Sequence, residues 1–196
     1  MTLTSLAHRA LTEAAGLHPL PPSAVAHLAD LAAPPRLVAH LRAVHDVAGQ
    51  LSDWLSQHHP AVPFDCAAVL FGAATHDIGK VLHPTELSAP GSLHEPAGHA
   101  LLLSRGVPER LARFARTHAS WTAADVTLED LLVSLADKVW KAKRVPALEQ
   151  LVTARLATAA DQEPWEVFMA LDDELDRIAS GADARLAYQS SYPITA

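Results

Sequence analysis

Histidines are unusually frequent in this chain, with twelve among its 196 residues. One of them, His76, is followed directly by Asp77 in the phrase AATHDIGK. Such a pair means little by itself, because histidine next to aspartate is common in proteins. Its context carries more weight, since three further histidines and an aspartate recur in separate segments of the chain. These additional candidates are His40, His94, His118 and Asp137.

These residue types suit a pair of divalent metal ions. An imidazole supplies a neutral nitrogen ligand, whereas a carboxylate supplies charge and two oxygens that can bridge two cations. Two ions held a few ångströms apart would clamp a phosphoryl group and lower the pKa of a shared water, which falls to roughly 7 in the best-studied single-zinc case. A water activated in this way attacks phosphorus, so no nucleophile from the protein is required.

The order of these residues, H…HD…H…H…D, resembles the HD superfamily of metal-dependent phosphohydrolases. The phrases that carry the resemblance are HDIGK at 76–80, HEPAG at 94–98, RTH at 116–118 and LADK at 135–138. The resemblance covers roughly residues 36–144. The HD-GYP cyclic-dinucleotide phosphodiesterases share these ligands, but the chain contains no GYP triplet, so that subfamily is not expected.

The resemblance implies six metal ligands: His40, His76, Asp77, His94, His118 and Asp137. In the family pattern Asp77 also acts catalytically, because it bridges the first ion to a second ion held by His94 and His118. This six-ligand form implies two divalent ions, iron or manganese, with a metal-bridged hydroxide that attacks phosphorus.

The stretch LHEPAGHALLLSRGVPERLARFARTH resembles the corresponding part of bacterial HD hydrolases that split symmetrical dinucleoside polyphosphates. The resemblance therefore implies a phosphorylated small molecule as partner, namely a nucleotide or dinucleotide. Two alternatives remain open at this point. One is an HD-type di-iron oxygenase, which has a similar ligand set, and the other is a catalytically silent regulatory module.

Basic residues near the candidate ligands are suited to binding a phosphate. Lys80 follows the His76–Asp77 pair and would bind a phosphate oxygen or orient Asp77, with a structural ion pair as the alternative. Lys141 and Arg144 lie four and seven residues after Asp137, on the same side of a predicted helix. We expect both to bind substrate, although a solvated helix end is the simpler interpretation of this cluster.

The periodicity of apolar residues and the placement of proline and glycine predict an all-α fold. The predicted helices cover approximately residues 3–15, 23–32, 36–57, 65–78, 95–105, 108–118, 128–143 and 164–188. We expect one helical-bundle domain of the HD type over residues 1–196, with the metal-site core at about 36–144. The flanking helices at 1–33 and 160–190 either wrap this core or form a homodimer contact.

Two helical positions decide between competing histidines. His40 shares the apolar stripe of its predicted helix, whereas His45 lies about 140° further round the helix. We therefore expect His40, rather than His45, to approach the metals. His99 is interpreted as a helix-face histidine, because His94 occupies the family's His-Glu-x-x-Gly position.

Composition excludes several other classes of protein. The formal net charge of −7 argues against a broad nucleic-acid footprint. The single cysteine, Cys66, excludes a disulfide framework and favours a reducing cytoplasm. The longest apolar run, near residues 67–74, is too short to cross a bilayer, so a cytoplasmic protein without membrane contact is expected.

Overall fold

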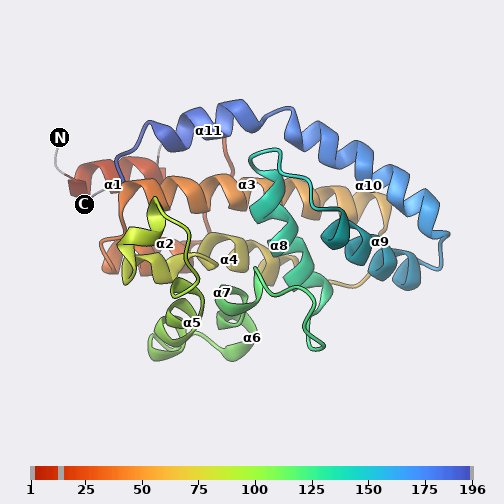
Figure 1. Cartoon of the computed structure of the whole chain (residues 1–196), viewed down its shortest axis with the longest axis horizontal. Coiled ribbons are helices and arrows are strands. Elements are labelled where there is room, and N and C mark those ends of the chain that lie inside the picture. The colour runs from red at the N-terminus through yellow and green to blue at the C-terminus, as the bar shows by residue number, and fades with distance from the viewer. Residues whose placement is uncertain (1–2, 13–15, 195–196) are drawn as a thin grey trace.

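The computed structural model describes residues 3–12 and 16–194, and within these ranges every regular element is a helix (Figure 1). The elements are α1 (Leu3–Thr12), α2 (Pro22–Asp30), α3 (Pro35–His58), α4 (Cys66–Thr75), the 3-10 helices η1 (Ile78–Val81) and η2 (Pro84–Leu87), α5 (His94–Ser104), α6 (Glu109–Ala112), α7 (Phe114–Thr117), α8 (Leu128–Val139), α9 (Pro146–Ala160), α10 (Pro164–Ala179) and α11 (Ala182–Ser190). The predicted all-α fold is confirmed. Within the described ranges, no helix is both long and apolar enough to span a membrane.

Helix α3 is the central element of the molecule. It begins with Pro35 in its first turn, where a missing N–H costs nothing, and it runs for 24 residues. Almost every side chain from Leu37 to Leu55 is buried, because α1, α4, α8, α10 and α11 all pack against it. In Figure 1, α10 and α11 follow one edge of the molecule and α5 to α7 lie toward the opposite edge. A residue on α3 is therefore well placed to face several helices at once.

The apolar core forms two clusters along α3. One contains Val44, Leu51 and Leu55 and extends over α4, α8, α9 and α10. The other contains Leu37 and Leu41 and extends over α1, α2 and the end of α4. His40 lies on α3 among the members of the second cluster, between Ala39 and Leu41, and just before the first cluster begins at Ala43.

Helix α8 is shorter than predicted. The expected helix over 128–143 ends at Val139, because Ala142 adopts the left-handed conformation with φ of 57°. The Lys143 N–H donates to Lys138 O at 3.2 Å, and the Ala142 N–H donates to Val139 O at 2.9 Å. These two bonds form a Schellman motif, which turns the chain away from the helix axis. The start of α8 is as predicted, with Thr127 and Asp130 forming a capping box.

Other helix boundaries also differ from the prediction. The segment 108–118 forms two short helices, α6 and α7, and the expected helix over 164–188 is divided between α10 and α11 around Ser180. Helix α9 was not predicted; it begins with Pro146 in its first turn and ends before Asp161, whose φ is 51°. Residues 13–15, the predicted end of the first helix, lie outside the described residues.

A direct contact between main chains joins η1 to α5. A Cβ atom placed on Gly79 would lie 2.0 Å from His94 O and 2.6 Å from Gly98 N, so only glycine fits. Gly98 in turn lies against the backbone of Gly79. This contact brings the turn after α4 against the first turns of α5, and it positions Asp77 close to His94.

Gly79→Ala is therefore expected to lower the free energy of unfolding by about 1 to 3 kcal/mol, because the added methyl group meets backbone atoms that cannot move aside. Urea denaturation followed by circular dichroism measures this change. Gly49→Ala is the matched control, since its added Cβ would come no closer than 3.4 Å to His18 Nδ1. The control should be neutral or more stable by up to about 1 kcal/mol. Equal stability of the two variants would contradict the close contact.

Candidate metal centre

Six histidine and aspartate side chains converge into two adjoining clusters. The first cluster contains His40, His76 and Asp137, and the second contains Asp77, His94 and His118. Within each cluster the potential ligand atoms lie within 4.8 Å of one another. These are the six residues that the sequence pattern singled out.

Most of these side chains come from the ends of helices. His76 is the C-cap of α4, Asp77 directly precedes η1, His94 is the first residue of α5 and His118 is the C-cap of α7. His40 and Asp137 lie within α3 and α8. Small residues in the last turns of α4, such as Gly72, let neighbouring helices approach, since a Cβ there would lie 2.7 Å from the Phe114 ring.

The Asp77 carboxylate lies between the two clusters, with one oxygen directed at each. Its Oδ2 atom is 3.2 Å from His40 Nε2 and 3.7 Å from His76 Nε2. Its Oδ1 atom is 3.0 Å from His94 Nε2 and 3.6 Å from His118 Nε2. The arrangement is that of a carboxylate able to bridge two cations.

Asp137 completes the first cluster, next to His76 and His40. Its Oδ1 atom lies 3.4 Å from His76 Nε2 and 3.8 Å from His40 Nε2. Its other oxygen accepts a hydrogen bond from Lys138 Nζ at 2.6 Å. One oxygen of Asp137 thus faces the cluster while the other is held by a lysine.

Hydrogen bonds from the second ring nitrogen to a backbone carbonyl orient two of the histidines. His76 Nδ1 lies 2.9 Å from Ala73 O, and His118 Nδ1 lies 3.1 Å from Ala115 O. Carbonyl oxygens only accept hydrogen bonds, so in both rings Nδ1 carries the proton. The lone pair of each ring is therefore on Nε2, the atom that points to the carboxylates, as a metal ligand requires.

Several ring nitrogens at the centre are buried and, apart from the neighbouring carboxylate oxygens, have no hydrogen-bond partner: His40 Nδ1, His40 Nε2, His76 Nε2 and His94 Nε2. Buried polar atoms without partners are rare, because each one costs free energy. A divalent ion in each cluster would satisfy the three Nε2 atoms. The donor set of imidazole nitrogens and carboxylate oxygens therefore fits a pair of such ions.

The charge of the carboxylates in the centre also favours cation binding. Burial lowers the pKa of His118 to about 4, so its ring is neutral at pH 7. Burial opposes charge on His76 as well, but Asp77 and Asp137 outweigh it, and the net pKa of His76 is raised. The surrounding histidines, led by His76, hold the pKa of Asp77 well below its usual range despite its burial. The carboxylates are thus ionised and ready to accept cations.

Glu86 in η2 is a positioning residue that the sequence did not reveal. Its Oε2 atom lies 2.6 Å from His94 Nδ1 and accepts the His94 N–H at 3.1 Å, while Oε1 accepts the Leu93 N–H at 3.1 Å. Glu86 therefore both caps α5 and orients the His94 ring. No local pattern marks this role, because a loop separates Glu86 from its partners at the start of α5, seven and eight residues further along the chain.

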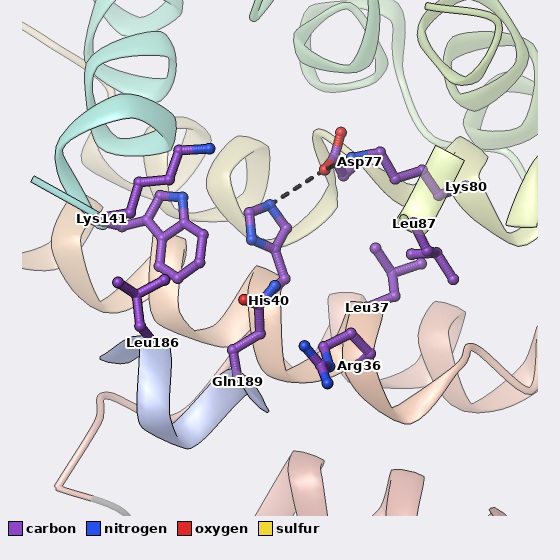
Figure 2. Close-up of a pocket in the computed structure, with 10 residues that line it drawn as sticks. Arg36, Leu37, His40, Asp77, Lys80, Leu87, Lys141, Leu186 and Gln189 are labelled. Atoms are coloured by element: carbon purple, nitrogen blue, oxygen red, sulfur yellow. Dashed lines mark hydrogen bonds and ion pairs between the residues drawn. The ribbon is translucent and has the colours of Figure 1, made fainter. Parts of the chain in front are cut away.

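A pocket of about 320 Å³ opens next to the first cluster (Figure 2). Its lining residues are Arg36, Leu37, His40, Asp77, Lys80, Leu87, Trp140, Lys141, Leu186 and Gln189. The Trp140 ring packs edge-on against the His40 ring, with centroids 5.0 Å apart. Asp77 is the single acidic residue of this lining, whereas three lining residues carry positive charge.

The C-terminal part of the chain supplies one wall of this pocket. Leu186 and Gln189 project from α11, and Arg36 at the start of α3 donates to Tyr192 O at 2.6 Å and to Ser190 O at 3.2 Å. From the sequence, the flanking helices are expected to wrap the core or to form a homodimer contact. Helix α11 nevertheless contributes directly to the surface next to the candidate ligands.

The predicted substrate-binding residues fall into two groups. Lys80 and Lys141 both line the pocket, and Lys80 Nζ also lies 2.6 Å from Asp77 Oδ2. Arg144 does not reach it, because the helical spacing behind that prediction is wrong: α8 ends at Val139. Its guanidinium group forms ion pairs elsewhere, with Glu149, Asp172 and Asp176.

The competing histidines lie away from both clusters. His45 lines a different cavity, and His99 Nε2 lies 2.7 Å from Glu109 Oε2 in a partly exposed pair. Comparison with known proteins identifies a match to the HD domain family over residues 37–140, which include all six converging side chains. No curated protein and no solved structure gives a significant match.

Glu86→Gln is expected to weaken binding of the second metal ion by about 10- to 100-fold while leaving the first ion unaffected, because the neutral amide orients His94 less well and makes it less basic. Titration of the protein with Mn²⁺, followed by calorimetry, would resolve the two sites. Glu109→Gln is the matched control, since the Glu109 carboxylate also lies 2.7 Å from a histidine ring nitrogen, Nε2 of the peripheral His99. If both variants bound Mn²⁺ alike, Glu86 would have no positioning role.

Proposed function

Because the chain belongs to the HD domain family, we propose that it is a metal-dependent phosphohydrolase that cleaves an ester or anhydride of a nucleotide or dinucleotide. The observation that carries the proposal is the Asp77 carboxylate, whose two oxygens face separate histidine clusters. Iron and manganese are the proposed metals, because the mixed imidazole and carboxylate ligands accept either ion.

The charge of the adjoining pocket supports an anionic substrate. Arg36, Lys80 and Lys141 line it, and such cations bind phosphate oxygens well. Leu37 and Leu186 supply apolar surface of the kind that a ribose or base requires. A di-iron oxygenase would need the same ligands, but it would have no comparable need for three cations around the pocket.

Each side chain has a distinct part in the proposed reaction. Divalent ions bound by the two clusters would neutralise phosphoryl charge and lower the pKa of a shared water. Asp77 contributes to both clusters and fixes their separation. Lys80, which contacts Asp77, and Lys141, at the other side of the pocket, bind phosphate oxygens and hold phosphorus in line for attack. Trp140 supports the His40 ring and limits access of bulk water.

Asp77→Ala should abolish metal-dependent phosphate release, more completely than loss of any single histidine. The substitution removes a ligand from each cluster together with the charge that offsets repulsion between two cations. Metal content measured by mass spectrometry, combined with phosphate release from a panel of nucleotides and dinucleotides with Mn²⁺ or Fe²⁺, tests this expectation.

His94→Ala is the control for Asp77→Ala, because it affects the second cluster alone and should leave one metal ion per chain. An Asp77→Ala protein that retained two ions and substantial turnover would refute the binuclear hydrolase. Normal metal loading of the wild type without phosphate release from any compound would refute the substrate class and leave the metal centre intact.

Lys141→Ala is expected to raise KM for an anionic substrate about tenfold, since a charge-assisted hydrogen bond to phosphate is lost, while metal content stays unchanged. Steady-state kinetics with the best substrate of the panel provides the measurement. Lys143→Ala is the matched control, because Lys143 is exposed and does not line the pocket. Identical KM values for the two variants would show that Lys141 does not bind substrate and is only part of the solvated surface.

A further inference from the structure

A second and larger cavity lies between α3, α4 and the segment that precedes α2. Its volume is about 580 Å³, within the range of small-molecule sites. The lining residues are His18, Pro19, Leu20, Pro21, Pro22, His45, Gly49, Ser52, Asp53, Cys66, Ala67 and Leu70. None of these residues belongs to the two histidine and aspartate clusters or to the pocket beside them.

Two buried polar groups in this cavity have no hydrogen-bond partner. His45 is 3% exposed, and neither of its ring nitrogens is paired; Ser52 is 1% exposed, and its hydroxyl is likewise unpaired. Each unpaired buried group costs free energy that a phenylalanine or alanine in the same place would not. Both residues line the cavity, so a bound molecule can supply the missing partners.

The chemistry of the walls defines what such a molecule must be. Burial lowers the pKa of His45 to about 4, so at pH 7 the neutral ring offers one donor and one acceptor. The nearby His18 Nδ1 and Asp46 Oδ1 lie 2.7 Å apart and are paired with each other. No lysine or arginine is among the described residues that line the cavity, and the one carboxylate among them belongs to the exposed Asp53. A phosphorylated compound therefore finds no counter-charge there.

We propose that this cavity is a binding site for an uncharged, largely apolar small molecule that carries both a hydrogen-bond donor and an acceptor. The prolines and Leu70 cover its apolar part, and His45 and Ser52 bind its polar atoms. The site is separate from the proposed phosphohydrolase centre and does not depend on it, because its ligand differs in charge and its lining shares no residue with the metal pocket.

Three molecules of nearly equal size test the proposal: benzamide, acetophenone and benzoate. Benzamide is neutral with a donor and an acceptor, acetophenone has the acceptor alone, and benzoate is an anion. Binding to the metal-loaded protein is measured by ligand-observed NMR titration at pH 7.5. Benzamide should bind at millimolar concentration or below and about tenfold more tightly than acetophenone, while benzoate should not enter this cavity.

Variants at His45 and Ser52 test whether benzamide binds in this cavity. His45→Phe preserves a planar ring of similar size and should weaken benzamide binding about tenfold, and Ser52→Ala should weaken it several-fold. Circular dichroism and urea denaturation verify that each variant folds, and Ser52→Ala provides the test if His45→Phe does not fold. Lys141→Ala alters the metal pocket and should leave the affinity for benzamide unchanged.

Three results would overturn the proposal. The first is absence of benzamide binding at millimolar concentration, and the second is equal affinity for benzamide and acetophenone. The third is undiminished benzamide binding in every folded variant at His45 or Ser52. Each of these outcomes can arise while phosphate release and metal content stay normal, so failure here is distinguishable from failure of the phosphohydrolase assignment.

Discussion

The shared carboxylate of Asp77 is the interaction on which the rest of the centre depends. Its two oxygens lie 3.2 Å and 3.0 Å from His40 Nε2 and His94 Nε2, which belong to different clusters. Two divalent cations bound side by side in these clusters would repel each other strongly, and a negative charge shared between them would offset that repulsion. Histidines from α3, from α5 and from the ends of α4 and α7 converge on this one side chain.

Much of the fold could be predicted because the sequence marks its helices with proline and glycine. Pro35, Pro96, Pro164 and Gly106 lie close to observed helix ends. The exceptions have a physical cause. Helix α8 ends in a Schellman motif with alanine, rather than glycine, in the left-handed position, so no residue type announces the end. The prediction that Arg144 binds substrate fails for the same reason, because helical spacing does not continue past the left-handed Ala142.

The candidate site also contains some residues that could be predicted from the sequence and others that could not. The six converging side chains could be predicted because their types and order form a recognisable pattern, and His40 could be separated from His45 by the helical angle between them. Glu86 and Gln189 could not be predicted. Glu86 lies in the short helix η2 outside the pattern, and Gln189 lies in α11, which is distant in the sequence from the six ligands. Such roles depend on how elements pack together, and a single sequence carries no local signal for that.

The contribution of α11 to the pocket has a consequence for the order in which the protein is made. All six candidate ligands precede Lys138 in the chain, so the residues of the two clusters are translated before Leu186 and Gln189. The wall formed by α11 is made after these residues. The bonds from Arg36 to Ser190 and Tyr192, which hold this wall, also form later. The six candidate ligands can thus converge while this side of the site is still open, and the pocket acquires its α11 wall only once α11 has docked on α3.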